Sequence, residues 1–175
     1  MLVEVSVQSL GLDRTNNTPV VILKERNGDR VLPIWIGAGE ASSIAMQLAD
    51  WAFSRPLTHD LLVSVIKDLG GVLDRVVISR VVENTYFAEL VIHRGAEVIS
   101  LDARPSDSIA VALRTKSTIF AEDSLLEEVS VEVSEDESVS YNPQAENPLE
   151  IEASSESLKE YLRKLNPEDF GRFTP

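Results

Sequence analysis

The sequence predicts an α+β domain with a mixed or antiparallel β-sheet built from hairpins and three or four packed helices. An acidic C-terminal extension with one helix follows it. Apolar residues alternate with polar ones over several short segments, which is typical of strands. The dipeptide Asn27-Gly28 lies between two such segments and suits the tight turn of a hairpin. Elsewhere the apolar spacing changes to that of amphipathic helices.

The first three predicted strands cover residues 3–7, 18–25 and 30–36. The second is rich in β-branched residues, which favour extended backbone. Pro33 has no N–H group to donate to a neighbouring strand. The third strand is therefore expected at an edge of the sheet or at a bulge.

Two helices are predicted next, over residues 41–52 and from Thr58 to a stop at Gly70-Gly71. Thr58 is expected to cap the second helix, because its hydroxyl can accept a bond from a free backbone N–H group. The helical spacing predicts a buried face on this second helix formed by Leu61, Leu62, Val65, Ile66 and Leu69.

The rest of the domain is predicted to contain three strands, over residues 74–82, 85–93 and 97–102, and then a buried helix over residues 104–114. Pro105 suits the first turn of that helix, and Asp107 complements the positive end of its dipole. A short strand near residues 118–121 and a helical turn near residues 123–128 are expected to complete it.

The predicted domain covers residues 1–128, followed by an acidic linker over 129–154 and a C-terminal helix and tail over 155–175. The linker contains the run Glu135-Asp136-Glu137 and few large apolar residues, which is typical of a solvated segment. The final helix, near residues 155–165, has Leu158, Tyr161, Leu162 and Leu165 on one face. This face could contact the domain or a neighbouring subunit.

The net charge argues against nucleic-acid binding by bulk electrostatics. The chain carries a net charge of −13, and residues 1–128 alone hold 12 Lys and Arg against 18 Asp and Glu. Contacts to phosphates require a basic surface. A nucleic-acid substrate would therefore need a local basic groove or a metal ion that screens the carboxylates.

The sequence contains no cysteine, which excludes disulfides, zinc–thiolate sites and cysteine nucleophiles. Its start lacks the basic and apolar regions of a signal peptide, and no apolar run is long enough to cross a bilayer. We therefore expect a cytoplasmic protein without a membrane partner.

Two similar motifs begin the second and third helices. Residues 55–60 read Arg-Pro-Leu-Thr-His-Asp and residues 104–107 read Arg-Pro-Ser-Asp. Each motif places a guanidinium and a carboxylate beside the free N–H groups of a helix start, where anions are attracted.

These motifs and the segment Leu32-Pro33-Ile34-Trp35-Ile36-Gly37 resemble the bifunctional nuclease (BFN) family in order and spacing. The similarity also includes Glu40-Ala41, residues 102–110 and Ile119-Phe120-Ala121-Glu122, and it covers roughly residues 1–128. The ending Asn166-Pro167-Glu168-Asp169-Phe170 is similar to the tails of short bacterial members. The resemblance implies a mixed α+β domain, a homo-oligomer and cleavage of both DNA and RNA.

Hydrolysis of a phosphodiester needs an activated water and neutralisation of the phosphate charge. Carboxylates that hold Mg²⁺ or Mn²⁺ can provide both, and so can His with Arg in the absence of metal. The candidate catalytic residues are His59, Asp60, Asp102 and Asp107. Arg55, Arg104 and Arg114 are candidate phosphate-binding residues, and Glu40, Asp102 and Asp107 are candidate ligands of the divalent metal.

Each candidate also has a structural interpretation. Carboxylates in a first helical turn are favoured by the dipole without any function, and His59 could belong to a capping turn. His93 has no motif around it and is interpreted as structural. No Ser-His-Asp arrangement can be defended from spacing alone.

Two main hypotheses remain. The first is a phosphodiesterase that acts on DNA, RNA or both at the Arg-Pro helix starts. The second is a non-catalytic oligomeric binding or regulatory module that holds an anionic ligand or a protein partner at the same place. A purely structural assembly protein is a third and weaker hypothesis.

Overall fold

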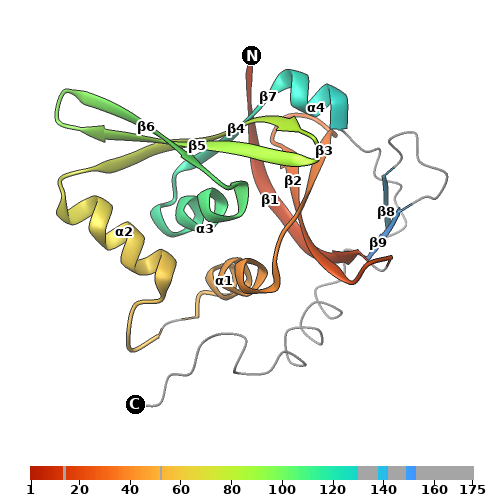
Figure 1. Ribbon diagram of the computed structural model, residues 1–175, viewed down its shortest axis with the longest axis horizontal. Coiled ribbons are helices and arrows are strands. Elements are labelled where there is room, and N and C mark those ends of the chain that lie inside the picture. Colours follow the sequence, from red (N-terminus) through yellow and green to blue (C-terminus); the bar gives the residue numbers. More distant parts are fainter. Residues whose placement is uncertain (14, 52, 130–137, 142–148, 153–175) are drawn as a thin grey trace.

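The strands of the computed structural model form one β-sheet (Figure 1). The structure describes residues 1–129 except 14 and 52, together with the backbone of residues 138–141 and 149–152. Across the sheet the strands lie in the order β3 (Val31–Trp35), β2 (Thr18–Glu25), β1 (Leu2–Asp13), β7 (Thr118–Glu122), β4 (Val72–Val82), β5 (Thr85–Arg94) and β6 (Glu97–Ala103).

The sheet consists of two antiparallel halves that meet at β7. Strand β7 pairs antiparallel with β1 and parallel with β4, whereas all other neighbours on the path are antiparallel. The parallel pair is possible because a helix connects β6 to β7 and returns the chain to the centre of the sheet. The predicted α+β class with a mixed sheet is confirmed.

Strand β3 pairs only with β2 among the described residues, with Pro33 opposite Ile22. It therefore lies at an edge of the sheet, as predicted from its proline. Residues 20–23 of β2 are buried on both faces of the sheet. Alternate residues of β2 thus belong to two separate apolar clusters.

Four helices accompany the sheet: α1 (Ala38–Leu48), α2 (Thr58–Asp68), α3 (Pro105–Thr115) and α4 (Asp123–Val129). Figure 1 shows α1, α2 and α3 together on one side of the sheet, with α3 between the other two and under β4 and β5. Four consecutive residues of α3, from Ile109 to Ala112, are almost fully buried. The prediction of a buried third helix is confirmed.

The predicted buried face of α2 is wrong except at Ile66, which is partly buried and packs against the core. Leu61, Leu62, Val65 and Leu69 are exposed, whereas Val63 is the buried residue of this helix. The reason is that α2 lies at the rim and packs mainly against α3 and β4, so one narrow side is covered. The apolar spacing identified a helix but not the direction from which the core would cover it.

The start of α2 also differs from the prediction. Leu57 is the N-cap residue and Thr58 is already helical. The carboxylate of Asp60 accepts a hydrogen bond from the Leu57 backbone N–H at 2.8 Å. Asp60 is the third residue of the helix, and a bond from its side chain to the N-cap N–H is one half of a capping box.

Beyond residue 129, the structure describes the short strands β8 (Ser138–Tyr141) and β9 (Leu149–Glu152) within the range of the predicted linker. Strand β9 pairs antiparallel with the end of β1, where Asp13 lies opposite Ile151. The division at residues 128 and 154 stays a prediction. The predicted final helix at residues 155–165 lies outside the described residues. Within the described part of the chain, no helix is long and apolar enough to cross a membrane.

The end of α3 supports a stability prediction, because its C-cap residue Lys116 has a left-handed backbone with φ of 57°. A residue with a Cβ is strained there and glycine is not. We expect Lys116→Gly to raise the free energy of unfolding by up to about 1 kcal/mol in urea titrations, because relief of this strain exceeds the loss from greater freedom of the unfolded chain. The matched control Lys67→Gly, inside α2, should lower the free energy of unfolding by about 1 kcal/mol. Equal destabilisation by both changes would contradict this account of the cap.

Candidate active site

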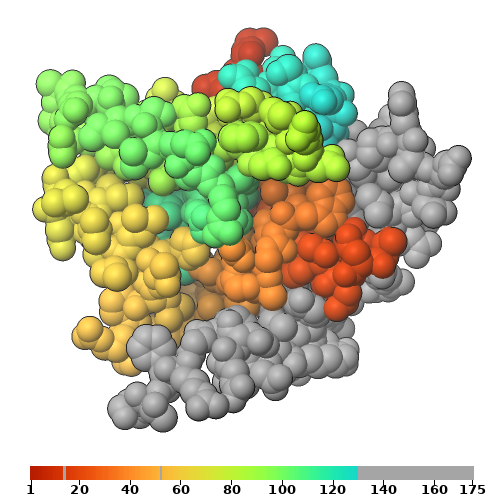
Figure 2. All heavy atoms as spheres, viewed as in Figure 1, coloured from red at the N-terminus to blue at the C-terminus, as the bar shows by residue number. Residues whose placement is uncertain are grey.

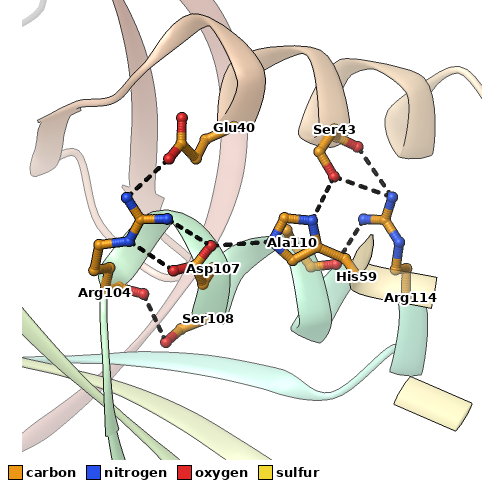
Figure 3. Close-up of polar contacts among 8 residues, drawn as sticks. All are labelled: Glu40, Ser43, His59, Arg104, Asp107, Ser108, Ala110 and Arg114. Carbon is orange, nitrogen blue, oxygen red and sulfur yellow. Dashed lines mark hydrogen bonds and ion pairs between the residues drawn. The ribbon is translucent and has the colours of Figure 1, made fainter. Parts of the chain in front are cut away.

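The polar side chains of the three clustered helices form one continuous network (Figure 3). Helix α1 provides Glu40 and Ser43, which lie three residues apart and so share a helix face. Helix α2 provides His59 and Asp60. Helix α3 provides Asp107 and Arg114, and Arg104 immediately precedes it as the N-cap residue.

The exposed end of the network is centred on Arg104, whose side chain is 66% exposed. Its Nε and Nη2 atoms donate to the two oxygens of Asp107 at 2.7 and 3.1 Å. Its Nη1 atom lies 2.9 Å from Oε1 of Glu40. One guanidinium thus connects the first turns of α1 and α3.

The middle of the network is His59, whose side chain is only 13% exposed. Its Nε2 atom lies 3.1 Å from Oδ1 of Asp107, and its Nδ1 atom lies 2.8 Å from Oγ of Ser43. The structure therefore joins Ser43, His59 and Asp107, an arrangement that sequence spacing did not reveal. The nitrogens are used in the reverse order from a serine hydrolase triad, where the acid contacts Nδ1. Ser43 is also buried, so the arrangement does not present an accessible nucleophile.

The buried end of the network is Arg114, whose side chain is 6% exposed. Its Nε atom donates to Oδ1 of Asp60. Its Nη1 atom donates to the Ala110 carbonyl at 2.9 Å, and its Nη2 atom donates to Oγ of Ser43 at 3.2 Å. Arg114 could bind phosphate as predicted only if these contacts opened. The folded chain uses it to hold α1, α2 and α3 together.

Two predicted residues lie apart from the network. Asp102 is exposed on β6, where it is paired in register with Glu89. Its neighbour Ala103 packs against the core, and successive side chains of a strand point to opposite faces, so Asp102 faces away from the helices. Arg55 is exposed in the connection between α1 and α2. Neither residue forms an ion pair or side-chain hydrogen bond with another described residue.

The predicted metal ligands do not form a suitable group in this arrangement. Asp102 points to the other face, and the guanidinium of Arg104 occupies the space between Glu40 and Asp107. Within the described ranges, no three His, Asp or Glu side chains lie close enough to hold a metal ion. The role of Mg²⁺ or Mn²⁺ stays a prediction without support from these residues.

Two carboxyl groups of the network, those of Asp107 and Asp60, are held in their charged form. Burial alone would raise the pKa of Asp107, but hydrogen bonds from Arg104 and His59 and the charge of Arg104 bring it below its ordinary value. Burial likewise opposes ionisation of Asp60, and Arg114 and the Leu57 backbone N–H together lower its pKa.

These lowered pKa values predict how stability depends on pH. A carboxyl group whose pKa is lower in the folded state stabilises the fold above its unfolded value, near 3.8, and this contribution is lost as the pH falls through the folded value. We therefore expect Asp60→Asn to be less stable than the wild type at pH 7. The difference between the two should shrink as the pH falls below about 3.8. Urea unfolding at a series of pH values measures it.

The matched control is Asp102→Asn, because Asp102 is exposed and unpaired among the described residues. Its unfolding free energy should follow that of the wild type at every pH. A constant difference between Asp60→Asn and the wild type from pH 7 to below the folded pKa would contradict the proposed ion pair.

Comparison with known proteins places this architecture in a family. Residues 21–134 match the family model of the bifunctional nuclease domain. Two uncharacterized proteins from strains of Mycobacterium tuberculosis are 40% identical over 167 residues, covering 95% of this chain and 97% of each relative.

Plant relatives are more distant. Bifunctional nuclease 1 of Arabidopsis thaliana is 27% identical over 105 residues, covering 58% of this chain but 32% of the plant protein. Bifunctional nuclease 1 of Oryza sativa is 26% identical over 110 residues. The family match spans most of the sheet and the three helices that carry the network, and the chain therefore belongs to the bifunctional nuclease domain family.

Proposed function

We propose that the chain hydrolyses phosphodiester bonds of DNA, RNA or both at the network between α1, α2 and α3. The observation that carries this proposal is the exposed guanidinium of Arg104 beside the carboxylate of Asp107, which His59 also contacts. Membership of a nuclease family and the names of the plant relatives support the same class of reaction.

Arg104 has free capacity to contact a phosphate. A guanidinium has five N–H donors, and Arg104 uses three of them on Asp107 and Glu40. One hydrogen on each terminal nitrogen is left, and the side chain is exposed. We propose that these two N–H groups bind non-bridging oxygens of the phosphate and offset the charge that develops during the reaction.

Asp107 would act on the attacking water. In hydrolysis the water oxygen forms a bond to phosphorus, the bond to the leaving oxygen breaks, and one proton passes from the water to the leaving oxygen. We propose that the carboxylate of Asp107 accepts the proton from water and that solvent returns a proton to the leaving oxygen. His59 and Arg104 hold the carboxylate in place through their hydrogen bonds.

The test is cleavage of single-stranded DNA, duplex DNA and RNA by the purified chain, with Mg²⁺, with Mn²⁺ and with a chelator. Asp107→Asn removes the proton acceptor but keeps the shape, so it should lower the turnover rate by about 100-fold or more. His59→Ala should lower it by about 10-fold or more, because the carboxylate loses one partner.

The matched control is His93→Ala, since His93 is exposed on β5 and its Nε2 atom lies 3.8 Å from Asp74, which does not belong to the network. Its cleavage rate should equal that of the wild type. Unchanged cleavage by both Asp107→Asn and His59→Ala would show that this site is not responsible for the activity. Cleavage that requires Mg²⁺ or Mn²⁺ would support the predicted role of a divalent metal.

A second candidate function is a non-catalytic module that holds an anionic ligand or a protein partner. One observation favours it: Arg104 lies between two carboxylates, and Arg114 is paired with Asp60, so the network is not basic. The absence of cleavage under all metal conditions, combined with binding of a labelled oligonucleotide, would support this candidate. Arg104→Ala should then weaken binding about tenfold or more, whereas Arg94→Ala, at an exposed pair on β5, should not.

We also propose that the chain forms a homo-oligomer through α2. The α2 apolar face, defined by Leu61, Leu62, Val65 and Leu69, is exposed to solvent. Figure 2 shows α2, in yellow, as one flank of the molecule. Exposed apolar side chains that share a helix face are typical of protein interfaces.

Substitution of this face tests the oligomer. Val65→Glu and Leu69→Glu should reduce the mass measured by light scattering from that of an oligomer to that of a monomer, because each would bury a charge in the interface. The control is Val82→Glu, which is half-exposed at the end of β4, away from α2 in the fold. A wild-type chain that is monomeric at all concentrations would contradict the proposal.

A further inference from the structure

We infer that Arg114, acting through Ser43, fixes the tautomer of His59, so that the ring of the neutral histidine carries its hydrogen on Nε2, facing Asp107. Arg114 and Ser43 are then positioning residues of the proposed site. The tautomer itself does not depend on the proposed function, and only its catalytic consequence does.

The hydrogen bond between Arg114 and Ser43 can run in one direction only. A guanidinium donates and never accepts. The contact of 3.2 Å between Nη2 of Arg114 and Oγ of Ser43 therefore uses the serine oxygen as an acceptor. Arg114 cannot turn away easily, because its other donors are bound to Asp60 and to the Ala110 carbonyl inside the fold.

The hydrogen of the Ser43 hydroxyl must then find an acceptor of its own. Among the described residues, the one acceptor in contact with it is Nδ1 of His59, at 2.8 Å. If Nδ1 carried the ring hydrogen instead, the serine oxygen would receive two donors and its own hydrogen would have no partner. Ser43 is only 7% exposed, so water does not readily replace that partner. Donation from Ser43 to Nδ1 is therefore the arrangement that satisfies every group.

The other side of the His59 ring faces Asp107. The carboxylate of Asp107 is ionised and can only accept hydrogen bonds, and its Oδ1 atom lies 3.1 Å from Nε2 of His59. A hydrogen on Nε2 satisfies this contact, whereas a bare nitrogen would face a negative oxygen. The two sides of the ring therefore require the same tautomer.

The consequence concerns the proposed reaction. The histidine donates to Asp107, and its free lone pair faces the buried end of the network rather than the substrate. His59 then holds the carboxylate that accepts the proton of water, and it is not the proton acceptor itself. The ion pair of Asp60 and Arg114 influences Asp107 through Ser43 and His59, although neither residue of the pair touches it.

The test is the pair of ¹⁵N chemical shifts of each imidazole ring in the full chain, at a pH about two units above the ordinary histidine pKa near 6.5. We expect His59 to show a protonated Nε2 and an unprotonated Nδ1 whose shift is displaced upfield by the bond from Ser43. His93 provides an internal reference in the same spectrum, and His93→Ala assigns the signals. A neutral His59 with its hydrogen on Nδ1 would overturn the inference.

Variants separate the contribution of Ser43 from that of Asp107. Ser43→Ala should move the Nδ1 shift downfield, and Ser43→Thr, which keeps the hydroxyl, should restore it. In an Asp107→Ala background the Nε2–H tautomer should persist, and adding Ser43→Ala should give a mixture of both tautomers. An unchanged Nδ1 shift in Ser43→Ala would overturn the role of Ser43.

The matched control is Ser42→Ala, since Ser42 is equally buried on α1 but donates to the Ala38 carbonyl. It should leave the shifts of His59 unchanged. In the cleavage assay, Ser43→Ala should lower the turnover rate about tenfold or more with little change in KM, and Ser43→Thr should recover most of it. The expected shifts in a chain that cleaves nothing would uphold the tautomer and reject the proposed function.

Discussion

The buried guanidinium of Arg114 is the constraint on which the arrangement of the three helices depends. A charge withdrawn from water in this way costs several kcal/mol unless it is paired and fully hydrogen-bonded. The chain satisfies it with Asp60 of α2, Ser43 of α1 and a carbonyl of its own helix α3. Each helix must therefore lie in one position relative to the other two. This requirement brings Glu40, His59 and Asp107, which are far apart in the sequence, into one network.

The same arrangement determines how charge is distributed through the network. The buried end consists of one cation and one anion, and the exposed end consists of one cation between two carboxylates. Arg104 is the one cation of the network that faces solvent to a large extent. The local groove of positive charge that the acidic composition would require for nucleic acid does not arise from these residues. Recognition of a phosphate at this place rests on two directed N–H groups rather than on an attractive field.

Several features of the fold were predictable because they depend on neighbouring residues. The hairpin around Asn27-Gly28, the edge position of the Pro33 strand and the buried helix that follows Pro105 were all predicted, and the structure confirms them. The hairpin connection is wider than the predicted tight turn, because β2 ends at Glu25 and β3 begins at Val31, and neither Asn27 nor Gly28 has a positive φ. Each follows from backbone conformation or from an unbroken apolar run. The buried side of α2 did not follow from its sequence. Apolar residues extend around more of the helix surface than α3 and β4 cover, and tertiary packing alone determines that Val63 is buried.

In the candidate site too, some features depend on neighbouring residues and others on tertiary packing. The sequence by itself determined that Glu40, Asp60 and Asp107 stand in first helical turns and that Arg104 stands next to a helix start, because these are local properties of the chain. It could not determine that Asp102 points to the opposite face of the sheet, or that Ser43 meets His59. Only the tertiary structure decided these points, because side-chain alternation in β6 and the packing of α1 and α2 around Arg114 set directions in space that residue spacing does not encode.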